Sequence, residues 1–96
     1  SDLEGVLRQH PAVADVAVVG VPSVLWGETP VAYAVRRPGS TVEAAELLQW
    51  FNQQVGKTQR LADLHLIDEL PRSAIGKVLK RELRERHLAG QADGAA

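Results

Sequence analysis

The chain carries its clearest structural signal in AVADVAVVGV, residues 12–21. Valine recurs throughout the segment, and Asp15 is its one charged residue. β-Branched side chains suit the pleated surface of a strand, and a stretch with so little charge suits burial. The segment therefore predicts a mostly buried β-strand, which Pro22 is expected to end.

The following segments extend this strand into a sheet. Residues 30–37 alternate larger apolar side chains with alanine, which is the two-residue period of a strand, and Pro38-Gly39 closes the segment as a turn. This second strand is predicted to lie antiparallel to the first. A third strand is predicted around residues 64–67, where leucines alternate with a polar residue.

Helical patterns surround these strands. Ser1 and Glu4 match a capping box at the start of a first amphipathic helix. A similar box at residues 40–43 opens a second helix that ends before Gly56, and residues 78–88 predict a final basic helix. The order α-β-β-α-β-α predicts an α+β domain, in which about three helices pack on a small three-stranded sheet.

Length and composition limit what this fold can be. A chain of 96 residues with 45% hydrophobic content forms one small domain. We expect residues 1–88 to form this domain and residues 89–96, which have little to bury, to form a disordered tail. The absence of cysteine excludes disulfides, thiolate metal ligands and cysteine nucleophiles. With no apolar run of membrane-spanning length and no signal-peptide pattern, the sequence predicts a cytoplasmic protein without a membrane span.

The net charge of −1 conceals an uneven distribution of charge. Basic side chains gather in residues 57–87, whereas acidic ones prevail before them. A cluster of this modest size suits a small molecule that bears phosphate groups better than a nucleic-acid backbone, which needs a broader basic face. We therefore expect no nucleic-acid partner.

The segment PRSAIGK, residues 71–77, is the main candidate for chemistry. Pro71 fixes φ at its start, and Gly76 permits a tight turn or a close backbone approach just before Lys77. Spacing alone favours a turn followed by a solvated helix residue, and the alternative is a lysine presented to a ligand. The segment is not a phosphate-binding P-loop, because that motif needs glycine at position 71 and a hydroxyl residue at position 78, where this chain has valine.

Two other sets of residues allow a functional and a structural interpretation. His10, His65 and His87 fall in different predicted elements without the close spacing of a metal site, so a structural role is favoured and no metal site is predicted. Trp26, in the loop between the first two strands, either packs back on the domain or offers an aromatic face on which a base can stack.

Three stretches, taken in order, resemble one known family. They are HPAVADVAVVGVP at residues 10–22, WGE at residues 26–28 and DELPRSAIGK at residues 68–77. Together they are similar to the C-terminal subdomain of the adenylate-forming enzymes, a superfamily of acyl-CoA synthetases, nonribosomal peptide synthetase adenylation domains and luciferases. The similarity runs from about residue 3 to about residue 87.

The resemblance implies a part in a two-step ligation. In this superfamily a carboxylate attacks ATP to give an acyl-adenylate, and a thiol of coenzyme A or of a carrier-protein pantetheine then takes the acyl group. Lys77 matches the adenylation lysine of the family, in a loop where Pro71, Arg72 and Gly76 position it. Its ammonium group would steady ATP and the negative charge that develops during transfer.

The resemblance also points to residues for coenzyme A. Trp26 and Gly27 match a position where some family members stack the adenine of coenzyme A, and Arg60 falls where a basic residue can meet its phosphates. The segment around Arg60 departs from the family's aromatic-Lys-x-Pro pattern, with Thr58 in place of the aromatic residue and Leu61 in place of the proline.

The family pattern further implies a partner domain. A large N-terminal domain would hold ATP with its Mg2+ and the acyl pocket, and this mobile subdomain would rotate between the two half-reactions. The chain by itself is then expected to be inactive and to bind no cofactor, as an excised domain, a proteolytic remnant or a partner that acts in trans. The alternatives are an autonomous module that binds a nucleotide, coenzyme A or a protein, and the equivalent subdomain of a nonribosomal peptide synthetase.

Overall fold

The computed structural model describes residues 2–23, 27–56 and 59–95. Along these residues the elements follow the order α1 (Asp2–Arg8), β1 (Val13–Ser23), β2 (Gly27–Arg36), α2 (Ala44–Gln54), β3 (Asp63–Leu66) and α3 (Lys80–Ala95). This order confirms the predicted α+β class and the predicted succession of helices and strands.

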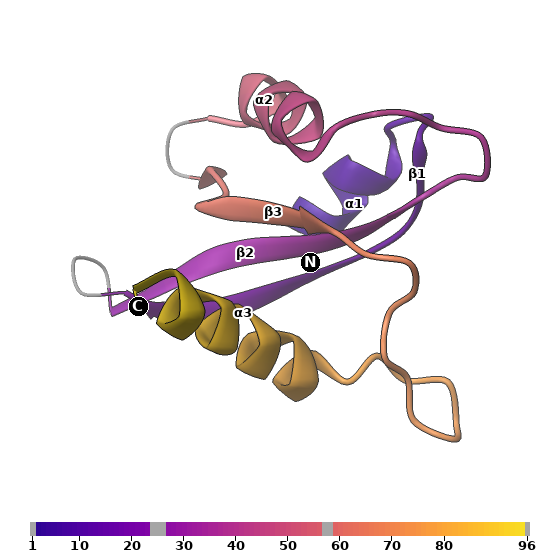
Figure 1. The fold of residues 1–96 in the computed structure, drawn as a ribbon. Helices are drawn as coiled ribbons and strands as arrows, with labels where there is room; N and C mark the ends of the chain where they lie inside the picture. The colour runs from indigo at the N-terminus through magenta and orange to yellow at the C-terminus, as the bar shows by residue number, and fades with distance from the viewer. Residues whose placement is uncertain (1, 24–26, 57–58, 96) are drawn as a thin grey trace.

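The described strands form one mixed sheet in the order β1-β2-β3. β1 pairs with β2 in the antiparallel sense, as predicted, and β3 pairs with β2 in the parallel sense. Parallel neighbours cannot be joined by a tight turn, because the chain must return to the end at which the first strand began. α2 lies in this return connection, above the sheet in Figure 1.

The sheet is the middle layer of three. α1 and α2 cover one face, and α3 crosses the other (Figure 1). The first face holds a core around the fully buried Leu7, Leu47 and Phe51, and the second holds a smaller core in which Leu83 of α3 is also fully buried. Each helix therefore buries its apolar side chains against the sheet, which is the main source of its stability.

Two strand boundaries differ from the prediction. β1 continues past Pro22 to Ser23, and β2 begins at Gly27, three residues before the predicted start at position 30. Proline is tolerated there because β1 lies at the edge of the sheet, where only one side of the strand needs hydrogen-bond donors. The two strands therefore form a longer hairpin than periodicity indicates.

The start of α2 also differs. Glu43, rather than Ser40, occupies the N-cap position, and its backbone N–H donates to the Glu46 carboxylate at 3.2 Å. The Ser40 hydroxyl instead accepts a hydrogen bond from the Val42 N–H at 3.3 Å. Glu43 and Glu46 have the same three-residue spacing as Ser40 and Glu43, and they are the pair that forms the capping box of α2.

α3 differs from its prediction at both ends. Val78 forms an isolated antiparallel bridge with Arg72, so the helix begins only at Lys80. It then continues to Ala95, past the expected end at Leu88 and into the segment where a tail is expected. Once the turns that hold the buried Leu83 and His87 have formed, each further residue adds one hydrogen bond for the backbone that it fixes, so the helix can continue beyond them. Among the described helices, none combines the length and apolar character needed to cross a membrane.

Candidate functional site

Residues 71–79, which we call the lysine loop, form a small antiparallel hairpin of their own. The Ser73 N–H donates to the Lys77 carbonyl at 2.8 Å, and the Leu79 N–H donates to the Pro71 carbonyl at 2.8 Å. These bonds satisfy backbone groups from both arms of the loop, even though the loop stands away from the sheet in Figure 1. The loop therefore has a defined shape although none of its residues is fully buried.

The turn of the lysine loop depends on Gly76. Its φ of 86° lies in the left-handed region, which side chains disfavour, and its N–H donates to the Ser73 carbonyl at 2.9 Å. The Lys77 N–H then donates to the Ser73 hydroxyl at 3.3 Å, and the Lys77 side chain is exposed. The structure thus places the predicted lysine directly after a turn that needs glycine, with its ammonium group open to solvent.

Arg72 makes two contacts that fix the lysine loop. One end of its guanidinium group donates to the Gly76 carbonyl at 2.7 Å, across the turn. The other end pairs with the carboxylate of Asp15, at the start of β1. A guanidinium group suits this task because its donors are held in one rigid plane. Arg72 therefore fixes both the turn that precedes Lys77 and the position of the loop against the sheet.

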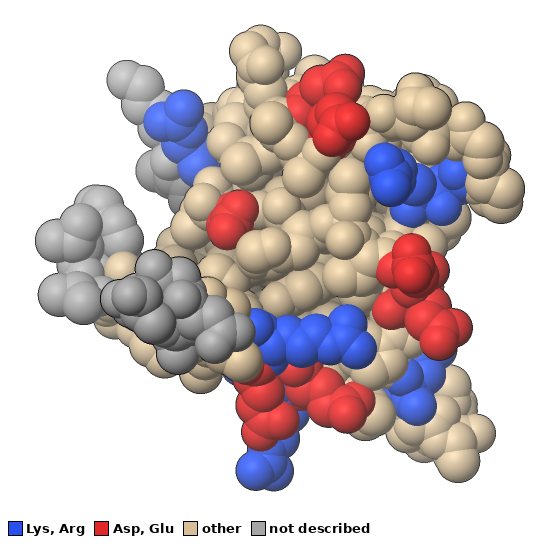
Figure 2. All heavy atoms as spheres, viewed as in Figure 1, with Lys and Arg blue, Asp and Glu red and all other residues tan. Residues whose placement is uncertain are grey.

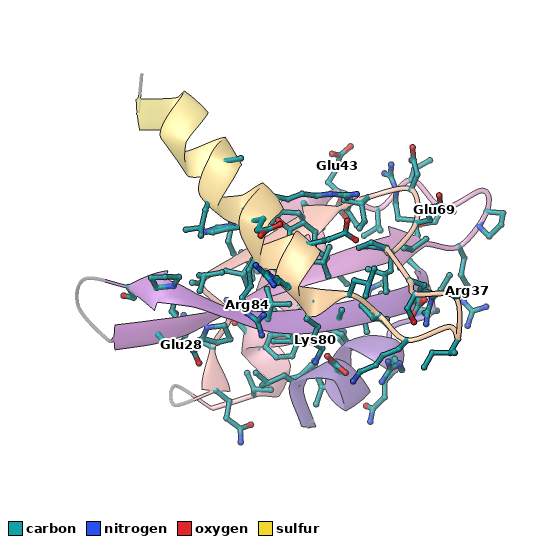
Figure 3. The ribbon with its side chains drawn as sticks, turned by 90° about the horizontal axis from the view of Figure 1, so that it is seen from below. Glu28, Arg37, Glu43, Glu69, Lys80 and Arg84 are labelled. Atoms are coloured by element: carbon teal, nitrogen blue, oxygen red, sulfur yellow. The ribbon has the colours of Figure 1, made fainter. Side chains whose placement is uncertain are left out.

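A second ionic contact anchors the end of the lysine loop. The Glu4 carboxylate of α1 accepts a hydrogen bond from the Val18 N–H at 2.8 Å and lies 2.9 Å from the Lys80 ammonium. Lys80 is the first residue of α3, and Figure 3 shows it beside the end of this helix that follows the lysine loop. Burial raises the pKa of Glu4, but the Val18 N–H and the Lys80 ammonium outweigh it, so the pKa lies below 4.5.

The contact between Glu4 and Lys80 was not predicted from the sequence. Glu4 matches a capping box with Ser1, a residue that lies outside the described residues. Local spacing cannot show that a carboxylate at position 4 meets an ammonium group at position 80, because packing on opposite sides of β1 brings them together. Only the structure shows that Glu4 is buried, and a buried carboxylate needs a partner of this kind.

The predicted contacts for coenzyme A lie away from the lysine loop. Gly27 begins β2 at the hairpin end of the sheet, where it pairs with Ser23, and Arg60 is exposed between α2 and β3. The lysine loop is tied to Asp15, near the opposite end of β1. Ser23 lies eight positions after Asp15 along β1, which is roughly 26 Å at 3.3 Å per residue. Trp26 lies outside the described residues.

The face seen in Figure 2 carries charges of both signs. Basic and acidic side chains lie interspersed around an uncharged centre rather than in a single basic field. Ion pairs such as Arg81 with Glu85 on α3 further neutralise the basic side chains of the second half of the chain. On this face the charge pattern therefore gives local contacts rather than a broad attraction for a polyanion.

Residues 2–77, from α1 to the candidate lysine, match the family model of the AMP-binding enzyme C-terminal domain. The chain belongs to this family. The AMP-binding enzyme C-terminal domain described here is 41% identical to a 4-coumarate–CoA ligase-like protein of Oryza sativa subsp. japonica over 92% of its length. It is 43% identical to 3-methylmercaptopropionyl-CoA ligase of Ruegeria pomeroyi over 88% of its length. In each case it spans 16% of the relative.

Solved structures give the same assignment. ATP-bound MatB from Rhodopseudomonas palustris matches 90% of the domain with a TM-score of 0.82 and 34% identity, and the match covers 17% of the MatB chain. An acyl-CoA synthetase from Brucella canis matches 94% of the domain with a TM-score of 0.80 and 31% identity, over 17% of that chain. The resemblance to the adenylate-forming superfamily is therefore confirmed, and the relatives include CoA ligases and acyl-CoA synthetases.

Proposed function

We propose that this domain is the mobile C-terminal subdomain of an ATP-dependent acyl-CoA synthetase and supplies Lys77 to the active site of a large N-terminal domain. The observation that carries the proposal is the lysine loop itself. Arg72 braces a turn that requires glycine, and this turn presents an exposed lysine away from the sheet. Such a device suits a residue that acts on a site outside its own domain.

The chemistry assigned to Lys77 is electrostatic. In the first half-reaction a carboxylate oxygen bonds to the α-phosphorus of ATP, the bond from that phosphorus to the bridging oxygen breaks, and pyrophosphate leaves. An ammonium group between the carboxylate and the α-phosphate holds the two anions together and stabilises the added charge of the transition state. ATP enters as its magnesium complex, which is a substrate. Loss of one such contact commonly costs about 10²- to 10³-fold in rate.

The second half-reaction calls for a different surface of the domain. The thiol sulfur of coenzyme A, or of a carrier-protein pantetheine, attacks the acyl carbon, and AMP leaves. We assign coenzyme A to the region of Trp26, Gly27 and Arg60. Gly27 lies beside Ser23 at one end of β1, and the lysine loop is tied to Asp15 near the other end. A rotation of the whole domain would therefore withdraw Lys77 from a single active site and bring the coenzyme A region to it. The proposal includes a cytoplasmic location, which agrees with a cysteine-free chain.

The test separates the two half-reactions in the full-length enzyme. Lys77→Ala is expected to lower carboxylate-dependent pyrophosphate exchange by at least about 10²-fold. The same variant should largely keep thioester formation from a supplied acyl-adenylate. Arg81→Ala is the matched control, because it removes another cation from the same part of the chain, and that side chain is 87% exposed. Equal loss of both half-reactions in Lys77→Ala, or of neither, would contradict the role assigned to Lys77.

A binding experiment separates this proposal from an autonomous module. The isolated chain is titrated with coenzyme A and with ATP, and tryptophan fluorescence is followed. The proposal expects no saturable binding of ATP at submillimolar concentrations, because the nucleotide site would belong to the other domain. Submillimolar binding of ATP by the isolated chain, with Lys77→Ala leaving pyrophosphate exchange unchanged, would favour the module.

A further inference from the structure

Three potential metal ligands meet between β3 and α3. Asp63 and His65 are two residues apart in β3, so their side chains leave the same face of the strand. This face carries α3, because His65 pairs in register with Tyr33, whose ring belongs to the core beneath that helix. His87, on α3, completes the set and is only 7% exposed.

The donor atoms already have the spacing of a coordination shell. Nε2 of His65 lies 3.2 Å from Nδ1 of His87 and 3.5 Å from Oδ2 of Asp63. One ligand atom from each residue lies within 4.8 Å of the others. Two ligand atoms that are each about 2.0–2.1 Å from a tetrahedral zinc ion are themselves about 3.3 Å apart. The His65 contacts match this separation, and a small movement would bring Asp63 and His87 to it.

We propose that Asp63, His65 and His87 form a binding site for a divalent transition metal of the zinc type, and that the bound ion fastens α3 to β3. Two imidazole nitrogens and one carboxylate oxygen are a donor set found in zinc sites, whereas Mg2+ prefers oxygen ligands throughout. Without metal, one imidazole donates its N–H to the other ring. The ion takes the place of this shared proton, and the ring that donated it stays neutral by carrying its N–H on its other nitrogen.

The proposed site is accessible to solvent and leaves one coordination position free for water. The three side chains line a surface cleft of about 460 Å³ that also includes Gly90, which has no side chain to close it. The Asp63 side chain is 50% exposed and that of His65 is 37% exposed, so an ion reaches them from solvent. Water would supply the fourth ligand. Arg86 lines the same cleft, and its positive charge opposes a cation there.

The site does not depend on the proposed function, because none of its ligands belongs to the lysine loop. His65 and His87 are 22 positions apart in the sequence, on β3 and on α3. A bound ion would therefore link the edge strand β3 to the helix α3. A ligand that binds only the folded chain stabilises it by an amount that grows with the ratio of free ligand concentration to Kd, so its melting temperature rises with ligand concentration. Metal binding should therefore be visible in stability as well as in direct titration.

The experiment uses the 96-residue chain with ZnCl2 and with CoCl2. We expect one ion per chain by calorimetry, a visible absorption spectrum of four-coordinate Co2+, and a rise in melting temperature with Zn2+. His65→Gln and Asp63→Asn remove ligands from half-exposed positions that do not carry the core. Each should weaken Zn2+ binding more than the roughly 10- to 100-fold lost when only a supporting residue is changed. His10→Gln is the matched control, because His10 packs edge-on against Trp50, away from the cleft.

A second, independent variant changes the charge beside the site. Arg86→Gln removes the positive charge that opposes a cation, leaves the three ligands in place, and should tighten Zn2+ binding. Circular dichroism of each variant establishes that it is folded before titration. The proposal is overturned if the wild-type chain binds neither ion at submillimolar concentration. It is also overturned if binding survives in His65→Gln and Asp63→Asn, or if it is lost in His10→Gln instead.

Discussion

Replacement of Glu4 by glutamine tests how firmly α1 holds the start of α3. The Glu4 side chain is 12% exposed and accepts a charge-assisted hydrogen bond from Val18 as well as the ion pair with Lys80. Glutamine keeps a neutral bond to Val18, so this contact loses about 0.5–1.5 kcal/mol. The ion pair adds about 0.2–1 kcal/mol, because the Lys80 side chain is 43% exposed and well solvated. We expect Glu4→Gln to cost about 1–2 kcal/mol of unfolding free energy at pH 7.

The stabilisation by Glu4 should depend on pH in a definite direction. The pKa of Glu4 is lowered in the folded chain, so its contribution to stability is fully present above the unfolded value of 4.5. It is lost as the pH falls through the lower folded pKa. The difference in unfolding free energy between wild type and Glu4→Gln should therefore be constant from pH 7 to about pH 5 and should shrink below pH 4.5.

Urea denaturation followed by circular dichroism, repeated across this pH range, measures the effect. Glu85→Gln is the matched control, because Glu85 forms an ion pair with Arg81 in which both side chains are mostly exposed, and its loss should change stability by at most about 0.5 kcal/mol. A double-mutant cycle with Lys80→Gln isolates the ion pair itself. If Glu4→Gln is as stable as wild type at pH 7, or if the difference persists unchanged at pH 3, the account of this contact is wrong.

Two further substitutions test the turn and the core. Gly76→Ala forces a side chain into a φ of 86° with free space around it, so we expect about 1–2 kcal/mol of destabilisation and slower pyrophosphate exchange in the full-length enzyme. The same change at Gly5, within α1, should instead stabilise the chain by about 0.5–1 kcal/mol; equal effects at both sites in urea denaturation would contradict the role of the turn. Phe51→Ala empties a fully buried position and should cost about 3–5 kcal/mol, much of the stability of so small a domain. If Phe51→Ala lowers the unfolding free energy by less than about 1 kcal/mol, the packing of α2 does not stabilise the core on that face of the sheet.

Local patterns were sufficient to predict the order of the elements and the loop that precedes Lys77. The valine-rich segment predicted β1, and the breakers on either side of Ser73 predicted the loop before Lys77. Both signals act within a few residues, through side-chain shape and backbone freedom, so a single sequence carries them. The errors lie where local rules compete, as at Pro22, which an edge strand tolerates, and at Glu43, which displaced Ser40 as the cap.

The sequence by itself determined the class of fold, the order of its elements and the exposed lysine behind a glycine turn. Only the tertiary structure decided which distant groups meet. The brace from Arg72 to Asp15, the pair of Glu4 with Lys80, and the cluster of Asp63, His65 and His87 each join elements that are far apart along the chain. The physical reason is that these contacts depend on strand register and on the face of the sheet that each helix covers. Neither is encoded in the spacing of any one segment.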